Sequence, residues 1–298
     1  MRLGVDLGGT KIEAAIIDRN GDFVWRKRQK TSKTSYDEML SSIAELVAEA
    51  RQKTDFDGPV GVGIPGSMMR SSQIIQGASL TYLNNRDLKS DLTNTLATDI
   101  RLENDANCFA LSEATDGAAA GCDVVFGLIL GTGCGSGLVI DGRPLTGLNG
   151  IAGEIGHNPL PWPITDEYLG HECWCGNEGC IETFISGTAV SKDYFDRTGV
   201  NMPVEEIAAR AGMDLVAESV FQVLEDRLAR SLAVVINMID PDAIVLGGGL
   251  SNLERLYQNV HPKWPRLVYS KHIETRLIRP KHGDSSGVRG AAWLWPYD

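Results

Sequence analysis

Short apolar runs alternate with longer stretches in which apolar residues recur at helical spacing. Residues 3–7, 60–64, 124–130 and 243–246 form the apolar runs, and each has the length of a buried strand. A capping box begins at Ser35, and the residues that follow it keep an apolar stripe at helical spacing. A second, longer stripe extends over 214–240. This alternation predicts an α/β fold.

Two segments about 120 residues apart share one plan. VDLGGTKIEAAIIDRNG (5–21) and LILGTGCGSGLVIDG (128–142) each run through an apolar strand, a Gly/Thr turn, a second apolar strand and an Asn-Gly or Asp-Gly turn. The repeat predicts two similar lobes, with a cleft in which one ligand is held from both sides.

Composition narrows the classes of function. A chain of 298 residues is long enough for two domains. Its net charge of -11 disfavours nucleic acid and anionic membranes as partners. The sequence starts directly with a strand pattern rather than a secretion signal, and no apolar run approaches the roughly 20 residues that span a bilayer. We therefore expect a cytoplasmic protein that acts on small molecules.

Three Gly-rich turns follow predicted strands. Glycine lets backbone N–H groups approach a phosphate closely, and threonine adds a hydroxyl donor. One such turn is weak evidence, because tight turns use glycine for steric reasons alone, but three together indicate a nucleotide site. The first two turns would bind the polyphosphate tail of a nucleotide, and the third its sugar and base. They comprise Gly8, Gly9, Thr10 and Lys11; Gly131, Thr132 and Gly133; and Gly247, Gly248 and Gly249.

One acidic residue breaks the symmetry of the repeat. Asp6 lies next to the first turn, where the second hairpin has the apolar Ile129. A carboxylate beside a phosphate is unfavourable unless a cation lies between them. We therefore expect a cation such as Mg²⁺ between Asp6 and the phosphates, bound directly or through water.

Half of the six cysteines lie in one loop, at Cys173, Cys175 and Cys180. Disulfides need an oxidising compartment, so three thiols in a cytoplasmic protein favour a metal site. Such a site needs a fourth donor. His157 and His171 both lie near enough in the sequence to supply it.

Asp105 follows a short strand over 100–102 and precedes a helix expected from about residue 106. A carboxylate in this position fits two roles. It could accept the proton of an attacking hydroxyl group, or it could be the N-cap of the helix, a role for which Asp is well suited.

The motifs taken together resemble the ROK sugar kinases of the actin/hexokinase-like superfamily. DLGGTK (6–11), GIPGS (63–67), ENDAN (103–107), residues 131–137, EIGH (154–157), CWCGNEGCIE (173–182) and LGGG (246–249) match in order over nearly the whole chain. ETFISGT (182–188) and the ending HGDSSGVRGAAWLW (282–295) are most similar to bacterial fructokinases that also accept mannose.

The resemblance implies a role for each site residue. Asp105 aligns with the catalytic base, and His157 aligns with the fourth ligand of a structural zinc ion, which places His157 ahead of His171. His157 would hold zinc through one ring nitrogen and meet the sugar with the other. The implied sugar contacts are Pro65, Gly66, Asn104, Asp105, Glu154, His157 and Glu182.

The same resemblance implies two ribonuclease-H-like lobes with an active-site cleft between them. One lobe would comprise 1–109 and 281–298, and the other 110–280. The implied reaction is phosphorylation of the 6-hydroxyl of fructose by ATP, by a homodimer. A glucokinase, an N-acetylhexosamine kinase and a non-catalytic sugar sensor are the alternatives. The sensors of the family carry an additional N-terminal helix-turn-helix, whereas this sequence starts at the first predicted strand and keeps both Asp6 and Asp105, so a sensor is the less favoured alternative. Residues 159–167 receive no role.

Overall fold

The structure, a computed structural model, describes residues 1–296 and divides them into two compact units. The first unit comprises Met1–Gly121, Gly137–Gly153 and the C-terminal segment from Lys281, and the second comprises Cys122–Ser136 and Glu154–Pro280. Residues 297 and 298, which the sequence analysis assigned to the first lobe, lie outside the described residues.

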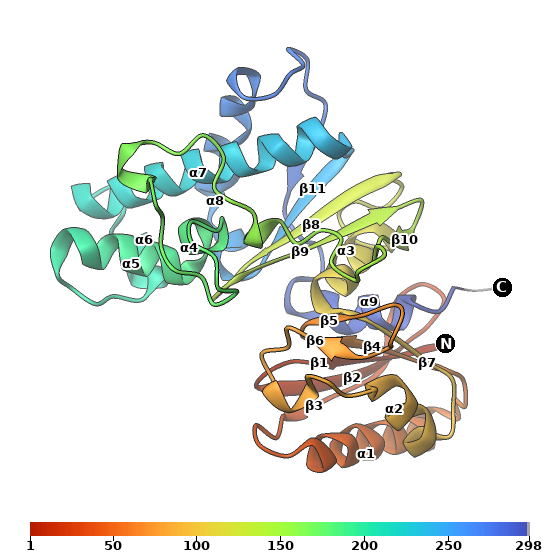
Figure 1. The fold of residues 1–298 in the computed structure, drawn as a ribbon. Coiled ribbons are helices and arrows are strands. Elements are labelled where there is room, and N and C mark those ends of the chain that lie inside the picture. The colour runs from red at the N-terminus through yellow and green to blue at the C-terminus, as the bar shows by residue number, and fades with distance from the viewer. Residues whose placement is uncertain (297–298) are drawn as a thin grey trace. The chain divides into compact units, whose positions relative to one another are not determined.

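The first unit is built on a five-stranded sheet in the order β3-β2-β1-β4-β7 (Figure 1). The β1–β2 hairpin and β3 pair antiparallel, whereas β4 and β7 join parallel to β1. A separate two-stranded ladder joins β5 to β6. The strands are β1 Arg2–Leu7, β2 Lys11–Ile17, β3 Phe23–Lys30, β4 Val60–Ile64, β5 Ser67–Met68, β6 Ile75–Gln76 and β7 Ile100–Asn104.

Helices cover both faces of this sheet. α1 packs against β2 and β3, and α2 lies beside α1, while α9 crosses β1 and β4 on the other face together with α3 (Figure 1). Ser35 caps α1 by accepting from Glu38 N, as the sequence predicted. The return of α9 to the first unit also agrees with the implied fold. The helices are α1 Tyr36–Thr54, α2 Leu88–Leu96, α3 Asp105–Thr115 and α9 Ser286–Trp293.

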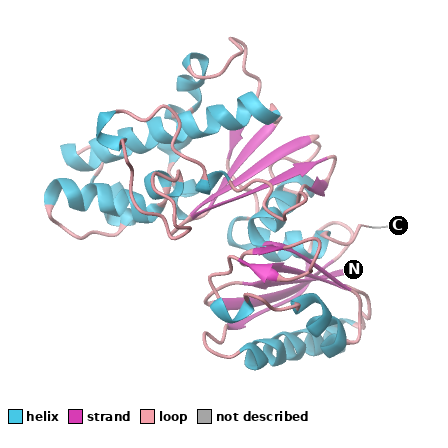
Figure 2. Cartoon of the chain, viewed as in Figure 1, coloured by secondary structure: helices cyan, strands magenta, loops and turns pink. Residues whose placement is uncertain are grey.

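The second five-stranded sheet has the order β10-β9-β8-β11-β12. This order matches that of the first sheet strand for strand, so the repeat seen in the sequence is a repeat of topology. Its strands are β8 Val124–Leu130, β9 Cys134–Ile140, β10 Arg143–Pro144, β11 Ala243–Gly247 and β12 Arg276–Ile278. The second unit holds β8, β11, β12 and the start of β9, together with a layer of helices around α7 (Figure 2). These helices are α4 Glu182–Ile185, α5 Gly187–Thr198, α6 Val204–Arg210, α7 Leu215–Ile239 and α8 Glu254–Asn259.

The division of the chain differs from the expected one at two places. Residues 110–121 and 137–153 belong to the first unit, although the sequence analysis placed them in the second. The first segment completes α3, which packs on α9, and the second reaches back to Glu103 through a hydrogen bond from Thr146 Oγ1 of 2.8 Å. Within residues 1–296, no helix is both long and apolar enough to cross a membrane.

Candidate active site and metal centre

The first Gly-rich turn connects β1 to β2 and faces solvent. The backbone N–H of Gly8 donates to Lys11 O at 3.0 Å, which closes the turn. Gly9 and Thr10 are exposed. The backbone of the turn is therefore accessible from solvent.

Asp6 lies at the end of β1 in a crowded acidic environment. Burial, and then the charges of Asp105 and Glu13, raise the pKa of Asp6 to about 7, while Lys11 and Arg28 act in the opposite direction. A Cβ atom on Gly287 would lie 2.8 Å from Asp6 Oδ2, so glycine is needed there to admit the carboxylate. Two neighbouring carboxylates of this kind favour a bound cation, which would stabilise both negative charges.

Asn104, rather than Asp105, is the N-cap of α3. Its Oδ1 accepts from the backbone N–H groups of Ala106 and Asn107, at 2.9 and 3.2 Å. Asp105 is the first residue of the helix and is half-buried. Of the two roles considered for Asp105, N-cap and proton acceptor, the N-cap role is therefore filled by Asn104.

The Pro65-Gly66 turn lies next to this helix start. Asn104 Nδ2 donates to Gly66 O at 2.9 Å, which connects the turn to the N-terminus of α3. Gly66 has a φ of 83°. The first unit therefore brings together the four sugar-site candidates that it contains: Pro65, Gly66, Asn104 and Asp105.

A cavity of about 490 Å³ in the second unit joins two of the predicted nucleotide turns. Gly131 and Thr132 line one part of it and Gly249 another. Gly247 and Gly248 are not among the lining residues; Gly247 ends the buried strand β11. The sequence analysis missed the rest of the lining, which has no phosphate signature. It comprises Leu130, Gly187, Thr188, Ser191, Pro203, Val204, Glu205 and Leu250.

Glu182 lies between the second turn and the cysteine loop. Its carboxylate accepts from Cys134 N at 2.8 Å and from Trp174 Nε1 at 2.7 Å. A Cβ atom on Gly133 would lie 2.6 Å from Glu182 Oε2, so the glycine of the turn also makes room for this carboxylate. Trp174 is a further residue that the sequence analysis did not select.

Glu154 and His157 belong to the same group of side chains. Burial raises the pKa of Glu154; the neighbouring His157 opposes this effect and the charge of Glu182 adds to it. Glu154, His157 and Glu182, the three sugar-site candidates in the second unit, are therefore close enough to influence one another electrostatically.

His157, Cys173, Cys175 and Cys180 form a cluster whose ligand atoms all lie within 4.8 Å of one another. Two sulfurs bound tetrahedrally at about 2.3 Å lie about 3.8 Å apart, and a sulfur and a nitrogen about 3.6 Å apart. The separation of Cys175 Sγ from Cys180 Sγ is 3.7 Å, and that of Cys173 Sγ from His157 Nδ1 is 3.6 Å. The donor set and its spacing fit a tetrahedral Cys₃His site.

The structure also distinguishes between the two candidate histidines. The ring of His171 packs against Phe184, with 5.7 Å between centroids, and His171 is not part of the cluster. His157 faces Cys173 with Nδ1, which leaves Nε2 as the nitrogen directed away from the thiols. Metal binding through His157 is the arrangement that the family resemblance implied.

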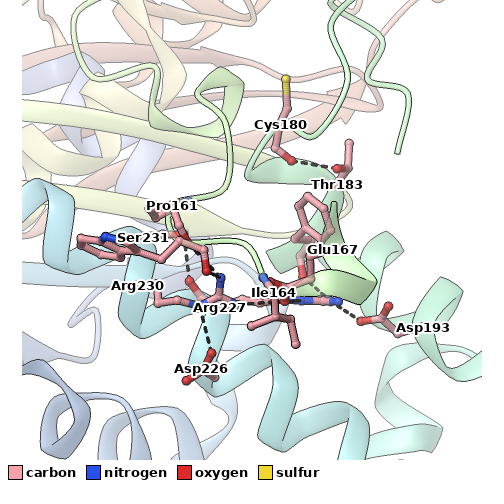
Figure 3. Close-up of polar contacts among 12 residues, drawn as sticks. Pro161, Ile164, Glu167, Cys180, Thr183, Asp193, Asp226, Arg227, Arg230 and Ser231 are labelled. Carbon is pink, nitrogen blue, oxygen red and sulfur yellow. Dashed lines mark hydrogen bonds and ion pairs between the residues drawn. The ribbon is translucent and has the colours of Figure 1, made fainter. Parts of the chain in front are cut away.

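The Pro159–Glu167 loop, whose role could not be predicted from the sequence, is held by buried ion pairs. Glu167 is 4% exposed and lies 2.8 Å from both Arg227 Nε and Arg230 Nη2 on α7 (Figure 3). Arg230 also donates to the carbonyl oxygens of Pro161 and Trp162, each at 2.9 Å. The loop that follows His157 is therefore fixed to α7.

Glu167→Gln is expected to destabilise the protein by about 3 kcal/mol at pH 7, because it leaves two arginines buried with less compensating charge. Burial acts to raise the pKa of Glu167, but hydrogen bonds from Arg230 and Arg227 outweigh it and lower the pKa. The contribution of Glu167 to the free energy of unfolding is therefore fully present above the ordinary Glu pKa of about 4.3. It is lost as the pH falls through the lowered pKa of Glu167 in the folded protein. Urea unfolding at several pH values measures this difference.

Asp166→Asn is the matched control, since Asp166 is the exposed neighbour of Glu167 in the same loop. Its free energy of unfolding should stay within about 0.5 kcal/mol of the wild type. Equal effects of the two substitutions would show that the buried ion pairs do not stabilise the loop.

Comparisons with known proteins identify similar kinases. The chain is 42% identical over 300 residues to an N-acetyl-D-glucosamine kinase of Pectobacterium carotovorum subsp. carotovorum, covering 99% of this chain and 98% of that protein. It is 39% identical to an N-acetyl-D-glucosamine kinase of Escherichia coli O157:H7 over 299 residues, 99% of each chain.

Solved structures show the same fold. A ROK hexokinase from Thermus thermophilus superposes with a TM-score of 0.87 at 28% identity, covering 98% of this chain and 96% of that one. A ROK family glucokinase from Streptomyces griseus, in complex with glucose and AMPPNP, superposes with a TM-score of 0.80 at 27% identity and covers 98% of both chains. The sequence pattern of the ROK family matches residues 2–297, and the chain belongs to that family.

Proposed function

We propose that this protein is an ATP-dependent kinase that phosphorylates the 6-hydroxyl group of N-acetyl-D-glucosamine. The observation that carries the proposal is the 42% identity, over 99% of the chain, to a protein named for this activity. The choice of ATP is supported by the related glucokinase, whose structure contains glucose and an ATP analogue. The motif resemblance had implied fructose as the substrate. The comparisons do not support fructose, and the relatives favour N-acetyl-D-glucosamine.

The site residues can be assigned to the parts of a phosphoryl transfer. The two Gly/Thr turns would bind the phosphates, and Mg²⁺ bound with ATP would neutralise their charge beside Asp6. The sugar hydroxyl oxygen would form a bond to the γ-phosphorus of ATP while the bond between that phosphorus and ADP breaks. Asp105 would accept the proton that this hydroxyl group loses. The remaining sugar hydroxyls would be bound by Asn104, Glu154, His157 and Glu182, whose oxygens and nitrogens suit paired hydrogen bonds.

The Cys₃His cluster fits a structural rather than a catalytic zinc ion. Four protein ligands leave no open position for a reacting water or substrate. Because His157 would be both a metal ligand and a sugar contact, the metal would hold the sugar-binding wall in place.

An assay of ADP release with ATP, Mg²⁺ and a panel of hexoses tests the proposal. We expect kcat/KM for N-acetyl-D-glucosamine to exceed that for glucose, mannose and fructose by at least about tenfold, since a site built for the acetamido group leaves polar groups unpaired with sugars that lack it. NMR of the product should place the phosphate on the 6-oxygen. A higher value for fructose would restore the fructokinase hypothesis, and no turnover with any sugar would favour the sensor. The homodimer implied by the resemblance stays a prediction, which light scattering can test.

A further inference from the structure

Each Gly/Thr turn accepts a hydrogen bond from the hydroxyl group of a threonine outside its hairpin. In the first unit, Thr31 Oγ1 donates to Gly8 O at 2.7 Å. In the second unit, Thr188 Oγ1 donates to Thr132 O, also at 2.7 Å. Thr31 follows β3, whereas Thr188 lies in the first turn of α5, so unrelated elements make the same contact.

These hydrogen bonds determine the direction of two backbone N–H groups. In a planar trans peptide, the C=O group and the N–H group of the next residue point in opposite directions. A carbonyl oxygen of Gly8 held toward Thr31 therefore turns the N–H of Gly9 the other way. The bond from Thr188 does the same for the N–H of Gly133. In residues 1–296, neither N–H donates to a protein acceptor.

A second carbonyl of each turn is held by a backbone N–H of the same supporting segment. Thr31 N donates to Thr10 O at 3.1 Å, and Gly187 N donates to Gly131 O at 2.7 Å. Glycine peptides can turn over at low cost, because glycine accepts positive and negative φ alike. Without these hydrogen bonds, a turn could present carbonyl oxygens, rather than N–H groups, to an anion.

We propose that Thr31 and Thr188 are positioning residues for phosphate binding, which keep the carbonyl oxygens of the two turns directed away from the nucleotide. The proposal rests on the proposed function and extends it to residues outside the Gly-rich motifs. Core packing does not account for both residues, since Thr31 is buried but Thr188 is exposed. What they share is the hydroxyl group and the carbonyl oxygen that accepts from it.

Calorimetric titration of Thr31→Val and Thr188→Val with Mg²⁺-AMPPNP tests the proposal. Valine keeps the shape and the backbone N–H but removes the hydroxyl donor. We expect each variant to bind the nucleotide about 5- to 30-fold more weakly, the effect of one lost hydrogen bond that leaves a carbonyl unpaired. Thr31→Ser and Thr188→Ser should restore affinity to within about twofold of the wild type. Adenosine, which has no phosphates, should bind the valine variants and the wild type equally.

Two other threonines provide matched controls. Thr54 Oγ1 donates to Ala50 O and Thr198 Oγ1 donates to Tyr194 O, each at 2.7 Å and each inside a helix. Thr198 lies in the same helix as Thr188. Thr54→Val and Thr198→Val should leave the affinity for AMPPNP unchanged. Melting temperatures of all variants show whether each one is folded.

The outcomes separate this inference from the proposed function. Wild-type affinity in both turn variants, or equal losses in the control variants, would overturn the inference and leave the kinase assignment intact. A loss of affinity for adenosine as large as that for AMPPNP would also overturn it. If the wild type binds nucleotide but phosphorylates no sugar, the proposed function fails while the role of the threonines is still measured. A wild type that binds no adenine nucleotide contradicts both.

Discussion

Asp105→Asn is expected to lower kcat by about 10²–10⁴-fold, the usual contribution of a general base. Asparagine has nearly the same shape but cannot accept the proton of the sugar hydroxyl. The substitution should not disturb α3, because Asn104 provides the N-cap. KM for the sugar and for ATP should change little, since the lost interaction acts on the proton transferred in the reaction. Steady-state kinetics, with circular dichroism to confirm folding, measure the effect.

Asp57→Asn is the control for this experiment. The Asp57 side chain is 95% exposed and lies in the same unit as Asp105. Its kcat should equal that of the wild type. A kcat of Asp105→Asn within about threefold of the wild type would show that Asp105 is not the general base.

The fold could be predicted largely from local sequence patterns. Apolar runs identified β1, β4, β8 and β11, and the repeated hairpins predicted two similar lobes. The boundary between the units could not be obtained in this way. It depends on α3 packing against α9, a contact between residues more than 170 positions apart, and no local periodicity records such a contact.

The site was predictable where its chemistry requires a particular residue type. Glycines proposed to lie beside phosphates, thiols proposed to hold a metal and a carboxylate proposed to lie near a hydroxyl all leave a signature in the sequence. The walls of the 490 Å³ cavity do not, because Pro203 and Val204 contribute shape rather than a specific chemical group. The anchor of the Pro159–Glu167 loop did leave a signal: Arg227 and Arg230 interrupt the apolar stripe of α7, and buried arginines need a carboxylate partner.

Replacement of one of the proposed zinc ligands should have the second large effect. Wild-type protein is expected to contain one zinc ion per chain, and Cys180→Ser should weaken zinc binding by more than about 100-fold, since it removes one of four ligands. Cys180 is buried, so the thiols and His157 around it would lose their common partner. Metal analysis of the purified proteins and competition with a chelator measure the loss.

Metal loss should affect the sugar more than the nucleotide. His157 and Glu182 lie at the cluster, and neither lines the cavity that contains Thr132 and Gly249. We therefore expect KM for the sugar to rise at least about tenfold, because loss of a group that orients a binding residue has effects of this size. The affinity for the nucleotide should stay close to that of the wild type. Cys122→Ser is the control, because Cys122 contacts Arg276 outside the cluster. A Cys180→Ser protein that keeps both its zinc and its sugar affinity would show that the four side chains do not hold a metal that shapes the sugar site.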